Sequence, residues 1–220
     1  MAKLELVKKY KIGLWIYDEA GEMPVRVEKS TALDISLNPT VNTRDYIVDQ
    51  HPTNEIDDYA PTLNQSITMY KGNPDYELLF PHAYDLPTGG KAKRNVLIVF
   101  MQEPVMRDRY TLQTAWQEGA EYYTKSGDEY APAGAVEEAD WQEDTYYTKE
   151  TALAGYKAWK MTESSLSFTN INGAEATLTF DINFGGVIMK GYASPDPQDK
   201  HPVFTRSDNA EEEWVDPFKA

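Results

Sequence analysis

The sequence predicts a fold built mainly from β-strands. Apolar and polar side chains alternate with a two-residue period in several segments, most clearly over 62–71 and 174–184. Tyrosine, which favours strands, occurs 15 times among the 220 residues. Only one segment carries a convincing helix start, at Asn73-Pro74. Together these observations indicate a β protein with one helix.

The first part of the chain is predicted to contain several short strands. Alternation or β-favouring composition places them at 11–17, 24–29, 33–37 and 44–49. Asn38-Pro39 is expected to end the third of these strands. The following polar segment, 51–61, contains Pro52 and Pro61 and is predicted to be a loop.

The strongest strand prediction in the first half covers residues 62–71. Its inward face would be formed by Leu63, Gln65, Ile67 and Met69. The predicted helix follows, with Asn73 as N-cap, Pro74 in the first helical position, and Asp75 near the positive end of the helix dipole. Pro81 opposes a long helix, so we expect this helix to be short or kinked.

The second half of the chain also reads as strands. The most apolar run, 94–102, predicts a buried strand, and weaker patterns predict strands at 110–116 and 156–161. After the strand at 174–184, Gly185-Gly186 is interpreted as a hairpin turn into a return strand at 187–192. From Ser194 onward the chain is rich in proline and acid, and is expected to order only against a partner.

An internal repeat marks residues 116–150 as an insertion. The segment beginning at Trp116 and ending at Lys125 returns, one residue shorter, between Trp141 and Lys149. We interpret the copies as two similar hairpin arms of a very acidic β excursion. Two roles remain open: a lobe that decorates the surface, or a carbohydrate- or surface-binding platform whose tryptophans and tyrosines stack on a ligand.

Composition excludes several classes of function. The net charge is −15, from 36 acids against 21 bases, which disfavours wrapping by nucleic acid. The charge serves solubility, or lines a surface past which a polyanion slides. The chain has no cysteine, so a thiolate nucleophile, a disulfide and a Cys-ligated zinc site are excluded. Without a long apolar run or an apolar N-terminus, we expect neither a membrane segment nor export by the general secretory route.

Candidate chemical sites are weak throughout. The histidines are far apart and lack metal-ligand spacing: His51, His82 and His201. Glu55, Asp57 and Asp58 could bind a cation but lack the glycine and ligand order of a calcium loop, so solvated charge is favoured. Gly89-Gly90-Lys91 lacks the remaining parts of a phosphate loop. We predict no catalytic, cofactor-binding or metal-binding residues, no cofactor, and no enzyme.

The order of the segments carries a resemblance. The segments concerned are the strand 44–49, the polar loop with Glu55 and Tyr59, the strand 61–71, the helix start 72–77, the apolar strand 95–102, and 174–184 leading through Gly185-Gly186 into 187–191. This ordered set, within 11–192, resembles the major tail tube protein of long-tailed bacteriophages and prophages of Gram-positive bacteria. The insertion at 116–150 departs from the family pattern.

The resemblance implies two packed β-sheets in a sandwich or half-barrel, one flanking helix and long hairpins. The tail-tube domain would cover 1–193, interrupted by 116–150, and an arm would cover 194–220. Six subunits would form a ring in which hairpins combine into a β-barrel around a lumen, and rings would stack into a tube. Partners would be other copies of the chain and the tape measure, tail tip and tail terminator proteins, in a virion assembled in the host cytoplasm.

The sequence therefore predicts a structural subunit of the phage tail tube, forming stacked hexameric rings around an acidic lumen that conducts DNA without binding it specifically. Strand edges closed between subunits and acids that repel phosphate agree with this role. The alternative is a non-catalytic β-sandwich that binds carbohydrate or a cell surface through Trp116 and Trp141. A hydrolase with paired carboxylates is a third and weaker reading.

Overall fold

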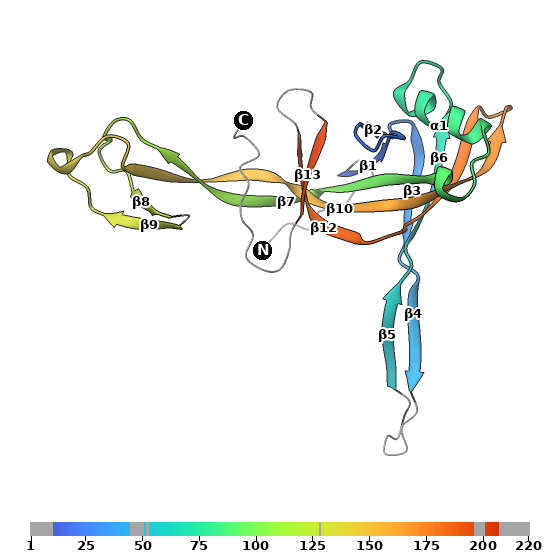
Figure 1. The fold of residues 1–220 in the computed structure, drawn as a ribbon, viewed down its shortest axis with the longest axis horizontal. Helices are drawn as coiled ribbons and strands as arrows, with labels where there is room; N and C mark the ends of the chain where they lie inside the picture. The colour runs from blue at the N-terminus through green and yellow to red at the C-terminus, as the bar shows by residue number, and fades with distance from the viewer. Residues whose placement is uncertain (1–10, 45–50, 52, 128, 196–200, 207–220) are drawn as a thin grey trace, which may run out of the picture. The chain divides into compact units, whose positions relative to one another are not determined.

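The computed structural model describes residues 11–44, 51, 53–127, 129–195 and 201–206. These residues form a mainly β protein with a single α-helix, as the sequence predicts. The chain divides into two compact units, which are described separately: unit 1 contains 1–103 and 156–220, and unit 2 contains 104–155 (Figure 1). Unit 2 includes the whole of the predicted insertion, 116–150.

The bounds of the elements are as follows. The strands are β1 (Ile12–Tyr17), β2 (Pro24–Arg26), β3 (Ser30–Ser36), β4 (Pro39–Arg44), β5 (Thr53–Tyr59), β6 (Thr62–Thr68), β7 (Lys93–Leu112), β8 (Tyr122–Ser126), β9 (Glu129–Gly134), β10 (Tyr146–Asn172), β11 (Thr177–Asn183), β12 (Ile188–Pro195) and β13 (Pro202–Arg206). The helices are α1 (Pro74–Tyr84) and two 3₁₀ turns, η2 (Gly89–Ala92) and η3 (Glu138–Asp140).

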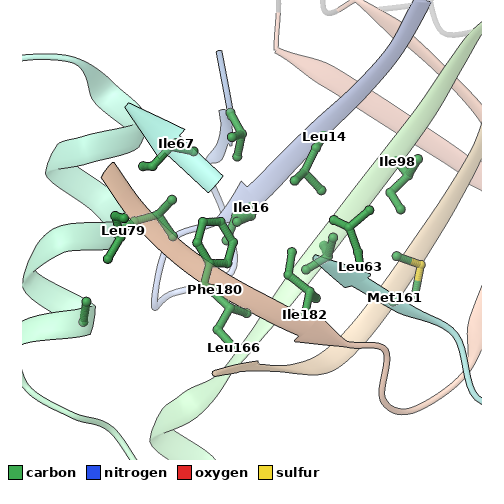
Figure 2. Packing of buried hydrophobic residues seen from close by; sticks show 14 residues of the cluster. Leu14, Ile16, Leu63, Ile67, Leu79, Ile98, Met161, Leu166, Phe180 and Ile182 are labelled. Carbon is green, nitrogen blue, oxygen red and sulfur yellow. The ribbon is translucent and has the colours of Figure 1, made fainter. Parts of the chain in front are cut away.

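The sheet of unit 1 curls around its own core. Its strands follow the order β2-β1-β7-β10-β11-β6-β3, while β12 also pairs with β10, and β13 pairs with β12. Side chains from both ends of this order share one buried cluster, which includes Leu14 and Ile16 of β1, Ile98 of β7, Leu63 and Ile67 of β6, and Phe180 and Ile182 of β11 (Figure 2). Burial of this apolar surface stabilises the curled sheet as a sandwich or half-barrel.

Strand β7 is buried on both faces over residues 96–99. Val96 and Ile98 face the main cluster, whereas Leu97 and Val99 face a second cluster. Other members of the second cluster come from β1, β10, β12 and β13, and include Tyr17, Ala158, Ala193 and Phe204. A strand covered on both sides needs a continuous apolar run, which explains the composition of 94–102.

Helix α1 begins where the sequence predicts and continues past Pro81 to Tyr84. Asn73 occupies the N-cap position, but its side chain donates to the Asp75 carboxylate and does not cap the helix. Asp75 is 1% exposed, and its Oδ2 accepts the backbone N–H groups of Glu28 and Lys29, each at 3.1 Å. Asp75 therefore joins the helix start to the chain after β2, and does more than complement the helix dipole.

The loop predicted at 51–61 is wrong, because residues 53–59 form β5. This strand pairs with β4, which begins at Pro39, so Asn38-Pro39 interrupts the extended chain only briefly. Pro61 follows β5 in sequence and takes no place in its ladder, and Pro52 lies outside the described residues. Every residue of β4 and β5 is exposed, so a polar composition is compatible with a strand here. Of the strand predicted at 44–49, all but Arg44 lies outside the described residues.

The hairpin predicted at Gly185-Gly186 is also wrong. β11 pairs with 165–172 of β10, and β12 pairs with 156–161 of the same strand, so β12 continues along β10 and does not return on β11. The two glycines pass close over β10: a Cβ at Gly185 would lie 2.6 Å from the Glu163 carbonyl oxygen. Glycine is required here for close approach, and not for a two-residue turn.

The C-terminal arm predicted from Ser194 differs in part from the structure. β12 extends to Pro195, and β13 pairs antiparallel with it, with Ser194 opposite Val203. Residues 194–195 and 202–206 are thus ordered by contacts within the chain, since β13 contributes Phe204 to the second apolar cluster. The rest of the predicted arm lies outside the described residues.

Candidate assembly surfaces

The β4–β5 hairpin is a two-stranded ribbon whose strands pair only with each other among the described strands (Figure 1). The register sets Val41 opposite Ile56 and Asn42 opposite Glu55, with a bulge between Thr40 and Val41. The outer edges of β4 and β5 therefore pair with no other described strand, and a strand of another chain can be added there.

The hairpin has one apolar face and one charged face. Val41, Ile56 and Tyr59 fall on the same face by register and are 53%, 54% and 48% exposed. On the opposite face the Arg44 Nε lies 3.3 Å from the Glu55 Oε2, and Asp58 follows on the same side. A two-stranded ribbon without a covered face is marginal in water, so an apolar face of this kind indicates a surface that becomes covered.

Asn38 anchors the base of the hairpin. It adopts a left-handed backbone with φ of 45°, a conformation that asparagine tolerates. Its Nδ2 donates to the Ala60 carbonyl and to the Thr62 Oγ1, both at 3.1 Å, while the Ala60 N–H donates to the Asn38 carbonyl at 3.2 Å. These hydrogen bonds join the start of the hairpin at Asn38 to its end at Ala60 and to the first residue of β6, Thr62.

The other edge strands of the described sheet differ in how far they are protected. β2, β9 and β13 each contain a proline, at Pro24, Pro132 and Pro202, and proline blunts an edge because it has no N–H. β3 is also an edge strand, with seven residues and no proline. Its long edge makes β3 the second candidate surface for pairing with another chain.

The repeat of unit 2 folds with local two-fold symmetry. The strand of the first copy, β8, pairs antiparallel with the start of β10 from the second copy. The register sets Tyr123 opposite Tyr147, Tyr122 opposite Thr148 and Tyr146 opposite Thr124. Equivalent residues of the two copies are therefore exchanged by a rotation about the Tyr123–Tyr147 pair. The prediction of two hairpin arms holds for β8–β9 only, because the second copy continues into the long β10.

Four tyrosines follow the same symmetry on one face of unit 2. Tyr110 and Tyr123 meet edge to face at 5.2 Å, and Tyr130 and Tyr147 do so at 5.1 Å. Tyr110 and Tyr130 then stack on each other, with ring centroids 4.0 Å apart and planes 2° from parallel. The Lys125 Nζ lies 5.6 Å from the Tyr130 ring centroid. The cluster packs largely against itself.

The two tryptophans predicted to bind carbohydrate belong to the packing of unit 2. Trp141 stacks on Tyr146 at 5.1 Å and contacts the buried Tyr122 at 5.2 Å. The Trp116 Nε1 donates to the Val136 carbonyl at 3.0 Å. Both indoles are half-buried. This placement does not favour a stacking role for them on a ligand.

An ion pair joins β7 and β10 within unit 2. The Lys149 Nζ lies 2.6 Å from the Asp108 Oδ2, and the Thr151 Oγ1 donates to the Asp108 Oδ1 at 2.8 Å. The hydrogen bond from Lys149, supported by that from Thr151, lowers the pKa of Asp108, and the same bond raises the pKa of Lys149. Both groups lie at the surface, so the pair adds little to stability.

The candidate chemical residues are not brought together. His82 lies on α1, where its Nδ1 accepts a hydrogen bond of 3.1 Å from Arg94; His51 and His201 lie in other parts of unit 1. Glu55, Asp57 and Asp58 project from the exposed β5, and Gly89-Gly90-Lys91 forms a 3₁₀ turn that leads into β7. Among the described residues, no group of three or more His, Asp or Glu side chains is arranged to hold a metal ion.

No family model and no curated protein sequence matches the chain. Within the described residues, no helix is long and apolar enough to cross a membrane. The case for function therefore depends on the surfaces above. The apolar face of the hairpin was missed in the sequence because β5 was interpreted as a loop. The available signal was the apolar Ile56 between the acids Glu55 and Asp57.

Proposed function

We propose that this chain is a structural subunit of a phage tail tube. It polymerises as stacked hexameric rings around an acidic lumen that conducts DNA. The observation that carries the proposal is the β4–β5 hairpin, in which both strands are exposed along their whole described length. Its partners are further copies of the chain, together with the tape measure, tail tip and tail terminator proteins, in the virion.

The hairpin supports assembly because it offers two kinds of adhesion. Its outer edges can extend a sheet of a neighbouring copy through backbone hydrogen bonds. Its apolar face, formed by Val41, Ile56 and Tyr59, gains free energy when a neighbour removes it from water. A contact between two different surfaces of neighbouring copies is heterologous. It generates a ring when the rotation between subunits closes, and an open, stacked array when it does not.

The charge of the hairpin agrees with a DNA-conducting lumen. Its strands carry Glu55, Asp57 and Asp58 against a single described base, Arg44. Acids that face the lumen of a ring repel the phosphate backbone and let DNA pass without sticking. Where the hairpin contacts a neighbouring copy, its apolar face turns toward that copy.

The test is assembly of the purified full chain at increasing concentration, followed by light scattering and negative-stain microscopy. We expect rings or tubes with a central hole. The double variant Val41→Ser/Ile56→Ser should remain monomeric, because it removes the apolar face and keeps the strands. A matched control is Val187→Ser/Ile171→Ser, at residues that are 67% and 50% exposed elsewhere in unit 1, and it should assemble normally.

Two results would reject the proposal. The first is a chain that stays monomeric at every concentration, even when seeded with phage tail tips. The second is a hairpin variant that forms the same tubes as the unmodified chain while its circular dichroism is unchanged.

A further inference from the structure

The curled sheet of unit 1 closes only in part, and a cavity lies where its two ends come near each other. β2 pairs with β1 over Trp15–Tyr17, and just after β2 the Val27 N–H donates to the Leu14 carbonyl at 2.9 Å, so Ile12 and Gly13 lie beyond this pairing. β3 pairs with β6 alone among the described strands. Between them is a cavity of about 370 Å³, whose lining combines the apolar Ile12, Leu14 and Leu33 with the polar Ser30 and Gln65. We call this feature, bounded by Ile12–Leu14, 26–30 and β3, the open seam.

Hydrogen bonds within the chain fix the rim of the open seam, segment 26–30. The buried Asp75 carboxylate accepts the N–H groups of Glu28 and Lys29, and the Thr68 N–H donates to the Lys29 carbonyl at 3.0 Å. The Ser30 Oγ donates to the Oε1 of Gln65, a residue that is 0% exposed, at 2.6 Å. A preformed site loses little conformational entropy on binding.

The charge of the seam contrasts with that of the whole chain. The rim, segment 26–30, carries Arg26 and Lys29 against Glu28, which gives one net positive charge (+2 − 1), and β3 adds Asp34, so the seam as a whole is neutral (+2 − 2). The chain as a whole carries −15. The exposed strand β5 carries Glu55, Asp57 and Asp58 and no base. The rim and β5 are therefore electrostatically complementary, which steers their encounter and sets their register.

We propose that the open seam binds strand β5 of a neighbouring copy of this chain, added beside β3. This inference rests on the proposed assembly function and names the contact within it. Both strands are seven residues long, and each has one edge that pairs with no other described strand. Ile56 and Tyr59 would cover the apolar side chains of the cavity lining, while the acids of β5 meet Arg26 and Lys29. Donor and acceptor lie at different places on one chain, so the contact is head to tail and propagates.

Disulfide trapping tests the contact directly, because the chain has no cysteine of its own. One full-length variant carries Asp34→Cys on the exposed edge of β3, and a second, with an affinity tag, carries Asp57→Cys on β5. Mixed under assembly conditions and oxidised, they should give a covalent heterodimer joined at these two positions. Asp57→Cys mixed with Glu175→Cys, an exposed position at the β10–β11 turn, should give only background crosslinking.

Charge exchange gives an independent measurement. Arg26→Glu/Lys29→Glu and Asp57→Lys/Asp58→Lys should each lose assembly when alone, because like charges then face each other. An equimolar mixture should assemble again. In the mixture the acidic seam of the first variant meets the basic β5 of the second, and the acidic β5 of the first meets the basic rim of the second. All four positions are exposed, so circular dichroism should confirm that both variants fold.

The outcomes separate this inference from the function it rests on. Tubes that form without the Asp34→Cys/Asp57→Cys crosslink, or charge variants that assemble alone, overturn the seam contact and leave the tube proposal standing. A crosslink formed within one chain, detected in a double-cysteine variant at high dilution, also overturns it. Failure of the unmodified chain to assemble at all rejects the tube proposal itself.

Discussion

Units 1 and 2 are stabilised by different side chains. The core of unit 1 is mainly aliphatic and fully enclosed, with Leu63, Ile67 and Phe180 all 0% exposed. Unit 2 has few buried aliphatic groups, and its packing consists of tyrosine and tryptophan rings, of which Tyr122 alone is as little as 2% exposed.

The difference follows from size and charge. A small excursion cannot enclose many apolar side chains, because most of its surface stays near water. An aromatic ring with a hydroxyl or N–H gives a large contact area and still bonds at the wet edge, as Tyr122 does with the Gln117 backbone. The acids of unit 2 then remain solvated outside the rings.

The largest effect is expected in the core of unit 1. Phe180→Ala leaves a cavity beside Phe168 and should lower the free energy of unfolding by about 3–5 kcal/mol, measured by urea denaturation. Ile171→Ala, at a side chain that is 50% exposed, is the control and should cost far less. Similar losses for the two variants would contradict the assigned core.

A smaller effect is expected when unit 2 loses a hydroxyl. The Tyr122 hydroxyl donates to the Gln117 carbonyl at 3.1 Å and accepts its N–H at 2.6 Å. Tyr122→Phe should therefore cost about 1–2 kcal/mol and speed proteolysis within 104–155. Tyr84→Phe, at a ring that is 75% exposed, should leave both measurements unchanged. If Tyr122→Phe is neutral, the ring and not its hydroxyl stabilises unit 2.

The stacked pair of unit 2 should show a coupling smaller still. A double-mutant cycle with Tyr110→Leu and Tyr130→Leu should give an interaction free energy of about 0.5–1.5 kcal/mol, in the range of aromatic pairs. Each variant and the double variant are compared by chemical denaturation. If the free-energy change of the double variant equals the sum of the two single changes, the rings have no interaction free energy, which would contradict the prediction.

The mildest test is the response of unit 1 to pH. Burial of His82, followed by the nearby charge of Arg94, lowers the pKa of this histidine below its ordinary 6.5. The unfolded chain then binds the proton more readily than the folded one, so stability is full above about pH 6.5 and falls as the pH drops through that value. The unfolding midpoint should stay level between about pH 8 and about pH 6.5 and decline below that, and His82→Gln should flatten this decline. An identical slope for both proteins would contradict the assignment.

Much of unit 1 could be predicted from local pattern. Leu63, Gln65 and Ile67 share the buried face of β6 that alternation predicts, and Asn73-Pro74 marks the helix start. The apolar run at 94–102 was recognised as a buried strand, although only the structure shows that two separate clusters cover its faces. In these segments burial and local propensity act in the same direction, so the sequence carries the signal.

The candidate surfaces were harder to predict. β5 is solvated on both faces, so no core demanded an apolar residue at every second position, and the hairpin was interpreted as a loop. Tyr110 and Tyr130, on strands outside the repeat, could not be paired without knowing the register. The open seam combines 12–14, 26–30 and β3, whose proximity depends on how the sheet curls.

By itself the sequence determined the β class, the single helix, the buried strand β7 and the presence of a repeated acidic insertion. Each depends on a short-range pattern of burial or backbone preference. Only the tertiary structure decided that Gly185-Gly186 passes over β10 without turning back, that β4 and β5 pair in solvent, and that the two repeat copies pair about Tyr123 and Tyr147. These features depend on which strands pair and in which register, and neither leaves a clear trace in the local sequence.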